Sequence, residues 1–365
     1  MMQIKDLTQY LEKLAPTAYQ ESYDNAGLIV GNPNDEIRGV LVTLDSTEEV
    51  IEEAIQKGCN LVIAHHPIVF KGLKRLTGKN YVERTIIKAI KNDVAIYAIH
   101  TNLDNVVGGV NFKIAEKLGL QNVKILAPKG DTLMKLVVFV PVERTGQLLD
   151  ELYKAGAGQI GNYSNCSFRV EGVGTFKPNQ AANPFIGQSG VQEEVEENRI
   201  EVIFPSFVQG PILAAMRRGH PYEEIAYYVS SLDNNNQEVG SGAIGELAQA
   251  IDENAFLTYL KEKMSVNVVR HTKLLHKPIK RIAVCGGAGG FLLGDAIAQK
   301  ADIFITADYK YHEFFDADNR IIIADIGHYE SEQFTKDLLK DYISKKFTNF
   351  AVHLSEIITN PIEYF

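Results

Sequence analysis

Short apolar segments alternate with amphipathic segments through the first third of the chain, and this alternation restricts the possible folds. The pattern predicts strands at Gly39–Asp45, residues 61–66 and Val94–His100, and helices at residues 47–57 and 82–92. Strands that are apolar at every position need cover on both faces, which indicates a mostly parallel sheet between helices. The sequence therefore predicts an α/β fold here.

The same pattern returns near the C-terminus. The predicted strands there are residues 281–285, 302–307 and 320–325, with a helix at 291–300. Residues 54–66 and 296–308 can be aligned without a gap, which places His66 opposite Asp308. We therefore expect two related α/β halves that form one discontinuous domain from residues 1–128 and 240–365.

The segment between these halves follows a different order of elements. Its predicted elements are a strand (133–141), a helix (144–155), two strands (167–176 and 199–205), a helix (208–218) and a strand (224–231). This βαββαβ order is typical of ferredoxin-like domains. The flanking segments, 127–131 and 233–238, are rich in turn formers and predict linkers. We therefore expect an inserted α+β domain at residues 131–233.

Composition disfavours several classes of protein. The chain has 365 residues, more than one core usually serves, and 45% of them are apolar, as in globular proteins. It has no long uncharged apolar run, and its first residues are unlike a signal peptide, so we expect a cytoplasmic protein without a membrane partner. Three widely spaced cysteines predict no disulfide framework. The net charge of -9 disfavours a nucleic-acid partner bound by general attraction to phosphate.

Histidine and carboxylate side chains follow the predicted strands at their carboxyl ends. In open α/β sheets, ligands gather at this edge, and imidazole together with carboxylate suits divalent cations such as zinc or manganese. The candidate metal ligands are His65, His66, Asp104, His328 and Glu332. We expect them to form one metal centre from both ends of the chain.

The spacing of these residues constrains the centre further. His65 and His66 are adjacent, and side chains alternate on a regular strand. This geometry indicates two metal ions, or one ligand beside one supporting residue. His328 and Glu332 are four residues apart and would share a face of a helix. His100 fits ligation and strand-end hydrogen bonding equally well.

Other polar or flexible segments near the predicted strand ends are candidates for further roles. Asp308, Lys310 and His312 could bind substrate or move protons, while Asp308 fits equally well as a helix cap. The glycine run 286–290 could bind phosphate through backbone N–H groups. It lacks the spacing of known nucleotide-binding motifs, which favours a tight turn approaching the metal centre.

Six segments together resemble the Nif-three-like family, whose members are named GTP cyclohydrolase 1 type 2 homologues. They are Asp24–Leu28, His65–Pro67, His100–Asp104, Gly286–Gly289, Thr306–His312 and Gly327–Glu332. The resemblance spans both outer regions, although alanine precedes Asp308 where the family commonly has glycine. The middle region, with His220–Glu224, is similar to the PII-like (CutA-like) insert of the longer members.

The resemblance implies a dinuclear metal centre held by the five candidate ligands, with Glu332 bridging. It implies a homohexameric ring (a toroid) whose inserts cap the openings. It also implies a metal-dependent hydrolase that opens the imidazole ring of GTP by attack of metal-bound hydroxide at C8. The metal identity stays open among zinc, manganese, iron and nickel. The alternative function is a non-enzymatic one: a metal-binding scaffold, a metal chaperone or a regulator that senses small molecules.

Overall fold

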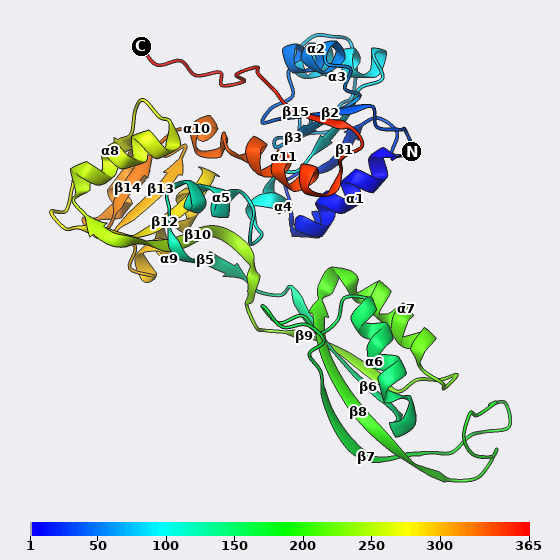
Figure 1. Cartoon of the computed structure of the whole chain (residues 1–365). Coiled ribbons are helices and arrows are strands. Elements are labelled where there is room, and N and C mark those ends of the chain that lie inside the picture. Colours follow the sequence, from blue (N-terminus) through cyan, green and yellow to red (C-terminus); the bar gives the residue numbers. More distant parts are fainter. Residues whose placement is uncertain (1) are drawn as a thin grey trace. The chain divides into compact units, whose positions relative to one another are not determined.

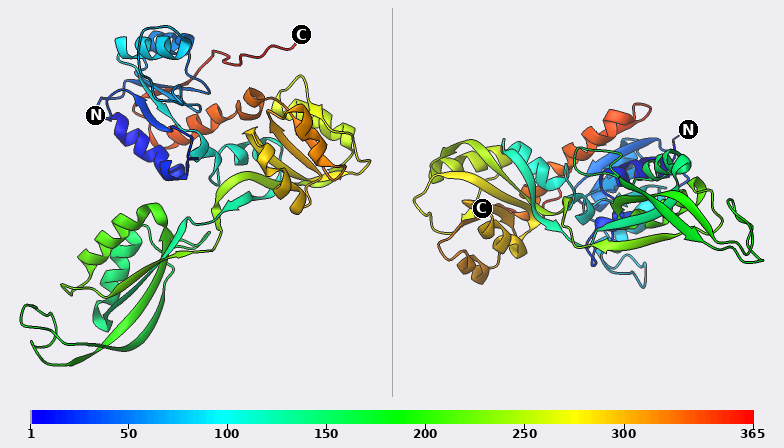
Figure 2. Two further views of the ribbon diagram at one scale, coloured as in Figure 1. Left: turned by 180° about the vertical axis from the view of Figure 1, so that it is seen from behind. Right: turned by 90° about the horizontal axis from the view of Figure 1, so that it is seen from below.

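The computed structural model describes residues 2–365 and divides the chain into two compact units. The first unit runs to Ala127 and resumes at Val239, and the second is Pro128–Glu238. In the first unit, two sheets share helices packed between and around them (Figures 1 and 2). The result is a mixed α/β fold with several sheets.

The first sheet has the strand order β1-β4-β3-β2-β15. Its strands are β1 (Gly27–Val30), β2 (Gly39–Thr43), β3 (Leu61–Ala64), β4 (Ala95–Ala98) and β15 (Ala351–Leu354). All neighbouring pairs are parallel except the edge pair of β1 and β4. The sheet therefore has the predicted parallel interior, with one antiparallel edge.

Helices cover both faces of this sheet because its strands are apolar at every position. The helices α2 (Glu48–Gln56) and α3 (Tyr81–Lys91) pack on the face that carries Leu41 and Val62. The helices α1 (Ile4–Leu14) and α11 (Thr335–Lys346) pack on the opposite face. Thr47 is the N-cap of α2, and its side chain accepts a hydrogen bond from the Val50 N–H.

The second sheet repeats this arrangement. Its order is β11-β14-β13-β12-β10-β5, and β12, β13 and β14 are parallel, while β11 pairs antiparallel with β14. The strands are β5 (Gln121–Lys129), β10 (Asn236–Ile251), β11 (Arg270–His271), β12 (Ile279–Ala288), β13 (Ile303–Ala307) and β14 (Ile322–Asp325). The order β11-β14-β13-β12 matches β1-β4-β3-β2 in strand direction, so β13 corresponds to β3, as in the ungapped alignment.

The remaining helices of the first unit connect or cover these strands. They are η1 (Thr17–Tyr19), α4 (Thr101–Asp104), α5 (Val110–Lys117), α8 (Glu253–Met264), η4 (Gly290–Leu292), α9 (Leu293–Ala298), η5 (Tyr311–Ala317) and α10 (His328–Glu332). A single buried cluster contains side chains from both sheets and from α1, α5, α8 and α11. This shared core makes the two halves one unit.

The second unit has the predicted βαββαβ order, with strand order β7-β8-β6-β9. Its elements are β6 (Leu133–Pro141), η2 (Val142–Arg144), α6 (Thr145–Lys154), β7 (Phe168–Phe176), β8 (Glu193–Pro205), η3 (Ser206–Val208), α7 (Gln209–Gly219) and β9 (Tyr227–Leu232). All strand pairs are antiparallel. The helices α6 and α7 bury one face of the sheet.

The second unit, Pro128–Glu238, begins within the predicted linker at 127–131 and ends within the one at 233–238. Residues 127–129 belong to β5 and residues 236–238 to β10. In the second sheet, β10 lies between β12 and β5. The segments outside strands are therefore limited to residues 130–132 and 233–235.

Within residues 2–365, each helix is too short or too polar to cross a membrane.

Candidate metal centre

The two sheets of the first unit bring the five predicted ligands together. His65 and His66 follow β3 directly, and Asp104 is the last residue of α4, which follows β4. His328 begins α10 and Glu332 ends it, immediately after β14 of the second sheet. The carboxyl ends of parallel strands therefore supply donors from residues more than two hundred positions apart in sequence.

The strand predicted for residues 61–66 ends at Ala64, and this correction matters for the site. His65 and His66 lie in a bend, where side chains no longer alternate between the faces of a sheet. Their ring centroids are 4.8 Å apart, so both rings can reach one region. The bend thus permits an arrangement that a regular strand would forbid.

The His65 ring is fully buried and held in one orientation. Its Nδ1 lies 2.8 Å from the carbonyl oxygen of Ile99, which can only accept a hydrogen bond. The proton must therefore sit on Nδ1, which leaves the Nε2 lone pair free. That Nε2 lies 3.6 Å from Asp104 Oδ1 and 3.8 Å from Glu332 Oε2.

The other two histidines are oriented in the same way, by carboxylates. His66 donates from Nδ1 to Asp45 Oδ1 at 2.8 Å, and His328 donates from Nδ1 to Asp308 Oδ2 at 2.7 Å. The Nε2 atoms of both rings face Glu332 Oε2, at 3.0 Å and 3.3 Å, respectively. In each case an oxygen acceptor fixes the tautomer that presents Nε2 to a cation.

Two of the groups of three donor atoms at this cluster share Glu332. One group is His65, Asp104 and Glu332, and the other is His66, His328 and Glu332. Donors about 2.1 Å from a tetrahedral cation lie about 3.4 Å apart, close to the observed separations of 3.0–3.8 Å. A third group, His65, His66 and His100, also brings the adjacent histidines together.

Three buried atoms at this centre lack a hydrogen bond of normal geometry within residues 2–365: His65 Nε2, Asp104 Oδ1 and Glu332 Oε2. Buried polar atoms of native proteins are nearly always satisfied by a protein group, a water or an ion. These three atoms face one another, and all are donors that divalent cations accept. The residues present therefore fit the binding of metal ions.

Protons stabilise the same cluster without a bound cation. Burial opposes the charged form of His66, but Asp45 and Glu332 outweigh it and raise its pKa to about 10. Burial also opposes the charged form of His328, but Glu332 and Asp308 outweigh this effect and raise its pKa to about 9. Burial, followed by repulsion from Glu332, raises the pKa of Asp104 to about 8. A cation must displace these protons to reach its ligands.

This competition predicts a pH dependence. His66 and His328 have folded-state pKa values above the ordinary 6.5, so their contribution to stability is complete below pH 6.5. It is lost as the pH rises through about 9 and about 10. We expect the melting temperature of chelator-treated protein to fall across this range, and that of zinc-loaded protein to fall less. Titration calorimetry near pH 7 in buffers of different ionisation enthalpy should show proton release; a buffer-independent enthalpy would contradict this assignment.

The glycine run is a turn that makes room for the cluster. Gly287 has φ +62°, and a Cβ there would lie 2.6 Å from Glu332 Oε1. The backbone N–H groups of Gly286, Gly287 and Gly289 already donate to Asn111, Ser331 and Thr306, respectively. Donors that are already used do not bind a phosphate, so the tight-turn interpretation is the one the structure supports.

Replacing Gly287 with alanine is expected to weaken metal binding. The new methyl group would displace Glu332, and the left-handed backbone would add about 1–2 kcal/mol of strain. We expect lower zinc content by elemental analysis and a lower urea midpoint. Gly294→Ala is the matched control, since a Cβ there contacts nothing within 4 Å. Equal zinc content in Gly287→Ala and wild type would contradict the close approach of this turn to Glu332.

His100 lies at the edge of the cluster and is held by a second carboxylate. Its Nδ1 donates to Asp24 Oδ1 at 2.7 Å, and Thr101 also donates to Asp24. Burial favours the neutral carboxyl, but these hydrogen bonds outweigh it and lower the pKa of Asp24 to about 2. The His100 ring lies edge-on to His65 and His66, with centroids 5.3 Å from each. His100 is therefore positioned both to contact a cation and to exchange protons with the cavity.

The three candidate catalytic residues are separated by the structure. Asp308 orients His328, and it makes no capping hydrogen bond to the helix that follows. Lys310 is exposed and pairs with Glu313 at 3.5 Å. His312 is exposed and stacks near Phe315. Neither Lys310 nor His312 lines the cavity at the cluster.

A cavity of about 760 Å³ opens onto the cluster. Its walls include several aromatic side chains, among them Tyr23, Phe70 and Phe291, and residues 359–362 of the C-terminal segment. Thr359 donates to Asp45 Oδ2 at 2.5 Å, which connects this segment to the carboxylate that orients His66. A cavity of this size accommodates a nucleotide-sized molecule.

Sequence reasoning missed several residues of this site. Asp45 ended a predicted strand, as the histidine pair did, so its position was a usable signal. Thr359 and Asn111 carried no such signal, because tertiary contacts alone bring them to the site. Cys285 also lines the cavity. Burial, together with Asp104 and Glu332, raises the pKa of its thiol, which argues against a thiolate nucleophile.

Known proteins resemble this chain over its whole length. Residues 2–361 match the family Duf34/NIF3 (NGG1p interacting factor 3). A Bacillus subtilis (strain 168) protein named "GTP cyclohydrolase 1 type 2 homolog" is 39% identical over 370 residues, covering 99% of this chain and 98% of its own. A Halalkalibacterium halodurans protein of the same name is 40% identical over 361 residues, covering 98% and 97%.

Solved structures agree with this relationship. The crystal structure of a Bacillus cereus protein related to NIF3 has a TM-score of 0.86 and 39% identity, and the comparison covers 100% of this chain and 99% of that one. A Staphylococcus aureus crystal structure has a TM-score of 0.80 and 32% identity over the same shares. Sequence and structure together show that the chain belongs to the Duf34/NIF3 family, as the six resembling segments predicted.

Proposed function

We propose that this protein is a metal-dependent hydrolase with two divalent cations at the cluster, and that GTP is its substrate. One observation carries the proposal: three histidines, each fixed through Nδ1 by an oxygen acceptor, direct Nε2 toward one shared carboxylate. The name shared by several relatives, "GTP cyclohydrolase 1 type 2 homolog", supports the choice of substrate.

His65 and Asp104 would hold one cation, His66 and His328 the other, and Glu332 would bridge them. Such a pair of cations, zinc being the first choice for these donors, supplies Lewis acidity and lowers the pKa of a water. The fixed tautomers orient the ligands, and burial of Glu332 excludes bulk water from the space between the groups. These features support hydrolysis over simple metal storage.

His100 and the cavity walls would act on the substrate. Asp24 holds the proton on His100 Nδ1, so Nε2 is free to accept or donate a proton. Tyr23, Phe70 and Phe291 offer aromatic faces against which a purine could stack. The cavity of about 760 Å³ provides the necessary room. These residues would orient a nucleotide and transfer protons at its ring.

Activity measurements test this proposal. Zinc- and manganese-loaded protein should release formate from GTP, and His65→Ala and Glu332→Ala should abolish that release. If wild type and both variants share the same trace activity, the hydrolase proposal fails and a metal-binding scaffold or chaperone becomes the better description. A panel of phosphoesters should be assayed in parallel. Hydrolysis of a phosphoester but not of GTP would show that the choice of substrate is wrong, while no hydrolysis of either would show that the hydrolase class is wrong.

His100→Gln is expected to lower kcat by about 10²–10⁴-fold while the metal content stays unchanged, because it removes proton transfer but none of the five proposed ligands. Elemental analysis and steady-state kinetics on the same preparation check both statements. Loss of metal in this variant would instead make His100 a ligand.

The family resemblance also supports a homohexameric ring in which Pro128–Glu238 is a PII-like insert. The βαββαβ order of that unit is compatible with this proposal. Light scattering on the full chain would measure the number of subunits.

A further inference from the structure

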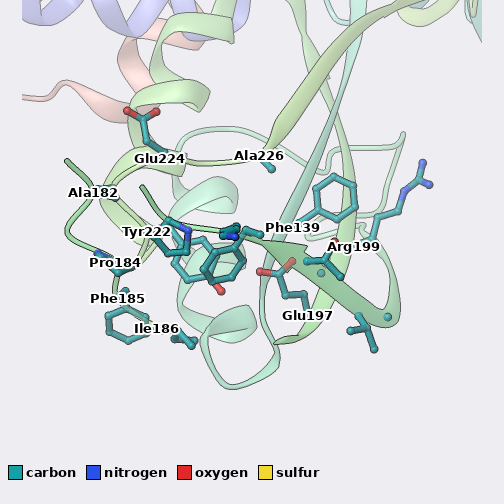
Figure 3. A pocket seen from close by; sticks show the side chains of 18 of the residues that line it. Phe139, Ala182, Pro184, Phe185, Ile186, Glu197, Arg199, Tyr222, Glu224 and Ala226 are labelled. Carbon is teal, nitrogen blue, oxygen red and sulfur yellow. The ribbon is translucent and has the colours of Figure 1, made fainter. Parts of the chain in front are cut away.

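The second unit contains a cavity that the metal chemistry does not use. The sheet of this unit has one face buried by α6 and α7, and the cavity, of about 680 Å³, lies on the other face (Figure 3). Strands β7 and β8 form its floor, and residues 177–186 and 222–226 form part of its wall. Its volume suits a small molecule.

Two glycines on β7 create the hollow. Gly172 pairs directly with Glu197 of β8, so their substituents lie on the same face, and a Cβ on Gly172 would meet nothing within 4 Å. A Cβ on Gly174 would collide with Glu197 Oε2. Because neither position carries a side chain, the Glu197 carboxylate occupies space next to an open region of the sheet.

Glu197 is buried without a counter-ion. Its exposed fraction is 8%, and no lysine, arginine or histidine among residues 2–365 forms an ion pair with it. Arg199, the nearest basic residue on β8, pairs with Glu201 at 2.8 Å. In Figure 3 the Arg199 guanidinium points away from Glu197, whose carboxylate is directed toward Tyr222. An unpaired carboxylate in such surroundings is costly to bury, so it favours a cationic partner.

The Tyr222 hydroxyl is a second polar group at this position. It is buried and lies next to the Glu197 carboxylate, to which it can donate a hydrogen bond. Burial first, and then the neighbouring Glu197, raises the pKa of Tyr222, so the phenol stays protonated near neutral pH. The cavity therefore offers one carboxylate and one hydroxyl, side by side, for an incoming N–H group.

Aromatic rings surround these polar groups. The Tyr222 ring lies 6.0 Å from Phe176 and 6.3 Å from Phe185, and Phe139 lies 5.9 Å from Tyr228, measured between centroids. All five rings line the cavity. Their faces carry negative charge density and attract cations. Acidic residues also exceed basic ones in the lining: Glu171, Glu197, Glu223 and Glu224 against Lys177 and Arg199.

We propose that this cavity binds a small organic cation, with an amidinium, guanidinium or ammonium group against Glu197 and an apolar or aromatic body between the rings. The Tyr222 hydroxyl accepts a further hydrogen bond from the same group. The site is independent of the metal centre and of the hydrolase proposal. It gives the second unit a binding function of its own.

Benzamidine and benzamide test this assignment because they have nearly the same shape and differ in charge. Calorimetric titration of the full chain should show benzamidine binding at least about tenfold more tightly than benzamide, about 1.4 kcal/mol. Glu197→Gln should abolish that preference. Glu196→Gln is the matched control, since this exposed neighbour does not line the cavity. Gly172→Val should weaken both ligands by filling the hollow, and unchanged melting temperatures would show that the variants fold.

Two results would overturn the assignment. The first is equal affinity for the two probes, or no benzamidine binding at concentrations up to about 10 mM, well above a weak dissociation constant of about 1 mM. The second is a preference for benzamidine that survives in Glu197→Gln. If benzamidine fails to bind and Glu197→Gln instead changes the number of subunits by light scattering, the face belongs to a contact between copies of the chain and the proposal is wrong.

Discussion

Glu332→Gln is expected to abolish binding of both proposed metal ions. Glu332 belongs to both donor groups, and its Oε2 lies within 3.8 Å of the Nε2 atoms of His65, His66 and His328. The amide keeps the size of the side chain but offers a neutral, weaker ligand. Loss of a residue that only hydrogen-bonds to a metal ligand lowers metal affinity by about 10–100-fold. Loss of the shared ligand itself should therefore lower metal affinity by more than about 100-fold.

Elemental analysis after zinc loading and desalting would measure this effect, with zinc-induced thermal stabilisation as a second readout. Saturating zinc at about 100 times its dissociation constant should stabilise wild type by about 2.7 kcal/mol and Glu332→Gln much less. Glu330→Gln is the control, because Glu330 lies on the same helix and bonds Asn360 instead of the cluster. If Glu332→Gln retained two ions per chain, the proposal that Glu332 bridges them would be wrong.

Single replacement of a histidine in each group is expected to remove one ion and leave the other. His65→Ala should affect the group with Asp104, and His328→Ala the group with His66. Each variant should therefore retain about one zinc per chain, since each remaining group keeps all its donors. The rest of the chain should stay folded, because the hydrophobic core shared by the two sheets is untouched.

His312→Ala is the control for this pair, since His312 is exposed and outside the cavity. Cobalt substitution would add a spectroscopic count of nitrogen ligands at the remaining ion. If both single variants lost all their metal, the cluster would act as one cooperative site. If either retained two ions, the assignment of that histidine as a ligand would fail.

Much of the fold follows from local sequence patterns. The apolar runs at residues 39–45 and 302–307 predicted buried parallel strands, because such runs need cover on both faces. The βαββαβ order of the second unit followed from the same periodicity. The antiparallel edges were not predictable, because the direction of an edge strand depends on the route of the chain between strands.

The residue types of the candidate site were also visible in the sequence. Five candidate ligands stood at predicted strand ends, and the structure brings them into two overlapping donor groups. They are His65, His66, Asp104, His328 and Glu332. Their orientation was not visible, because it depends on partners from other elements. Asp45 and the Ile99 carbonyl fix two of the rings, and Thr359 reaches Asp45 from the far end of the chain.

The sequence by itself determined the periodicity of the strands and helices, the interruption by a second unit and the set of candidate donor residues, since these depend on residue type and spacing. Tertiary structure alone decided that the strand before the histidine pair ends at Ala64, that each ring presents Nε2, and that Glu332 serves both groups. The physical reason is that contacts between residues far apart in sequence set all three features: the tautomer of each histidine, the bend at the histidine pair and the position of the shared Glu332.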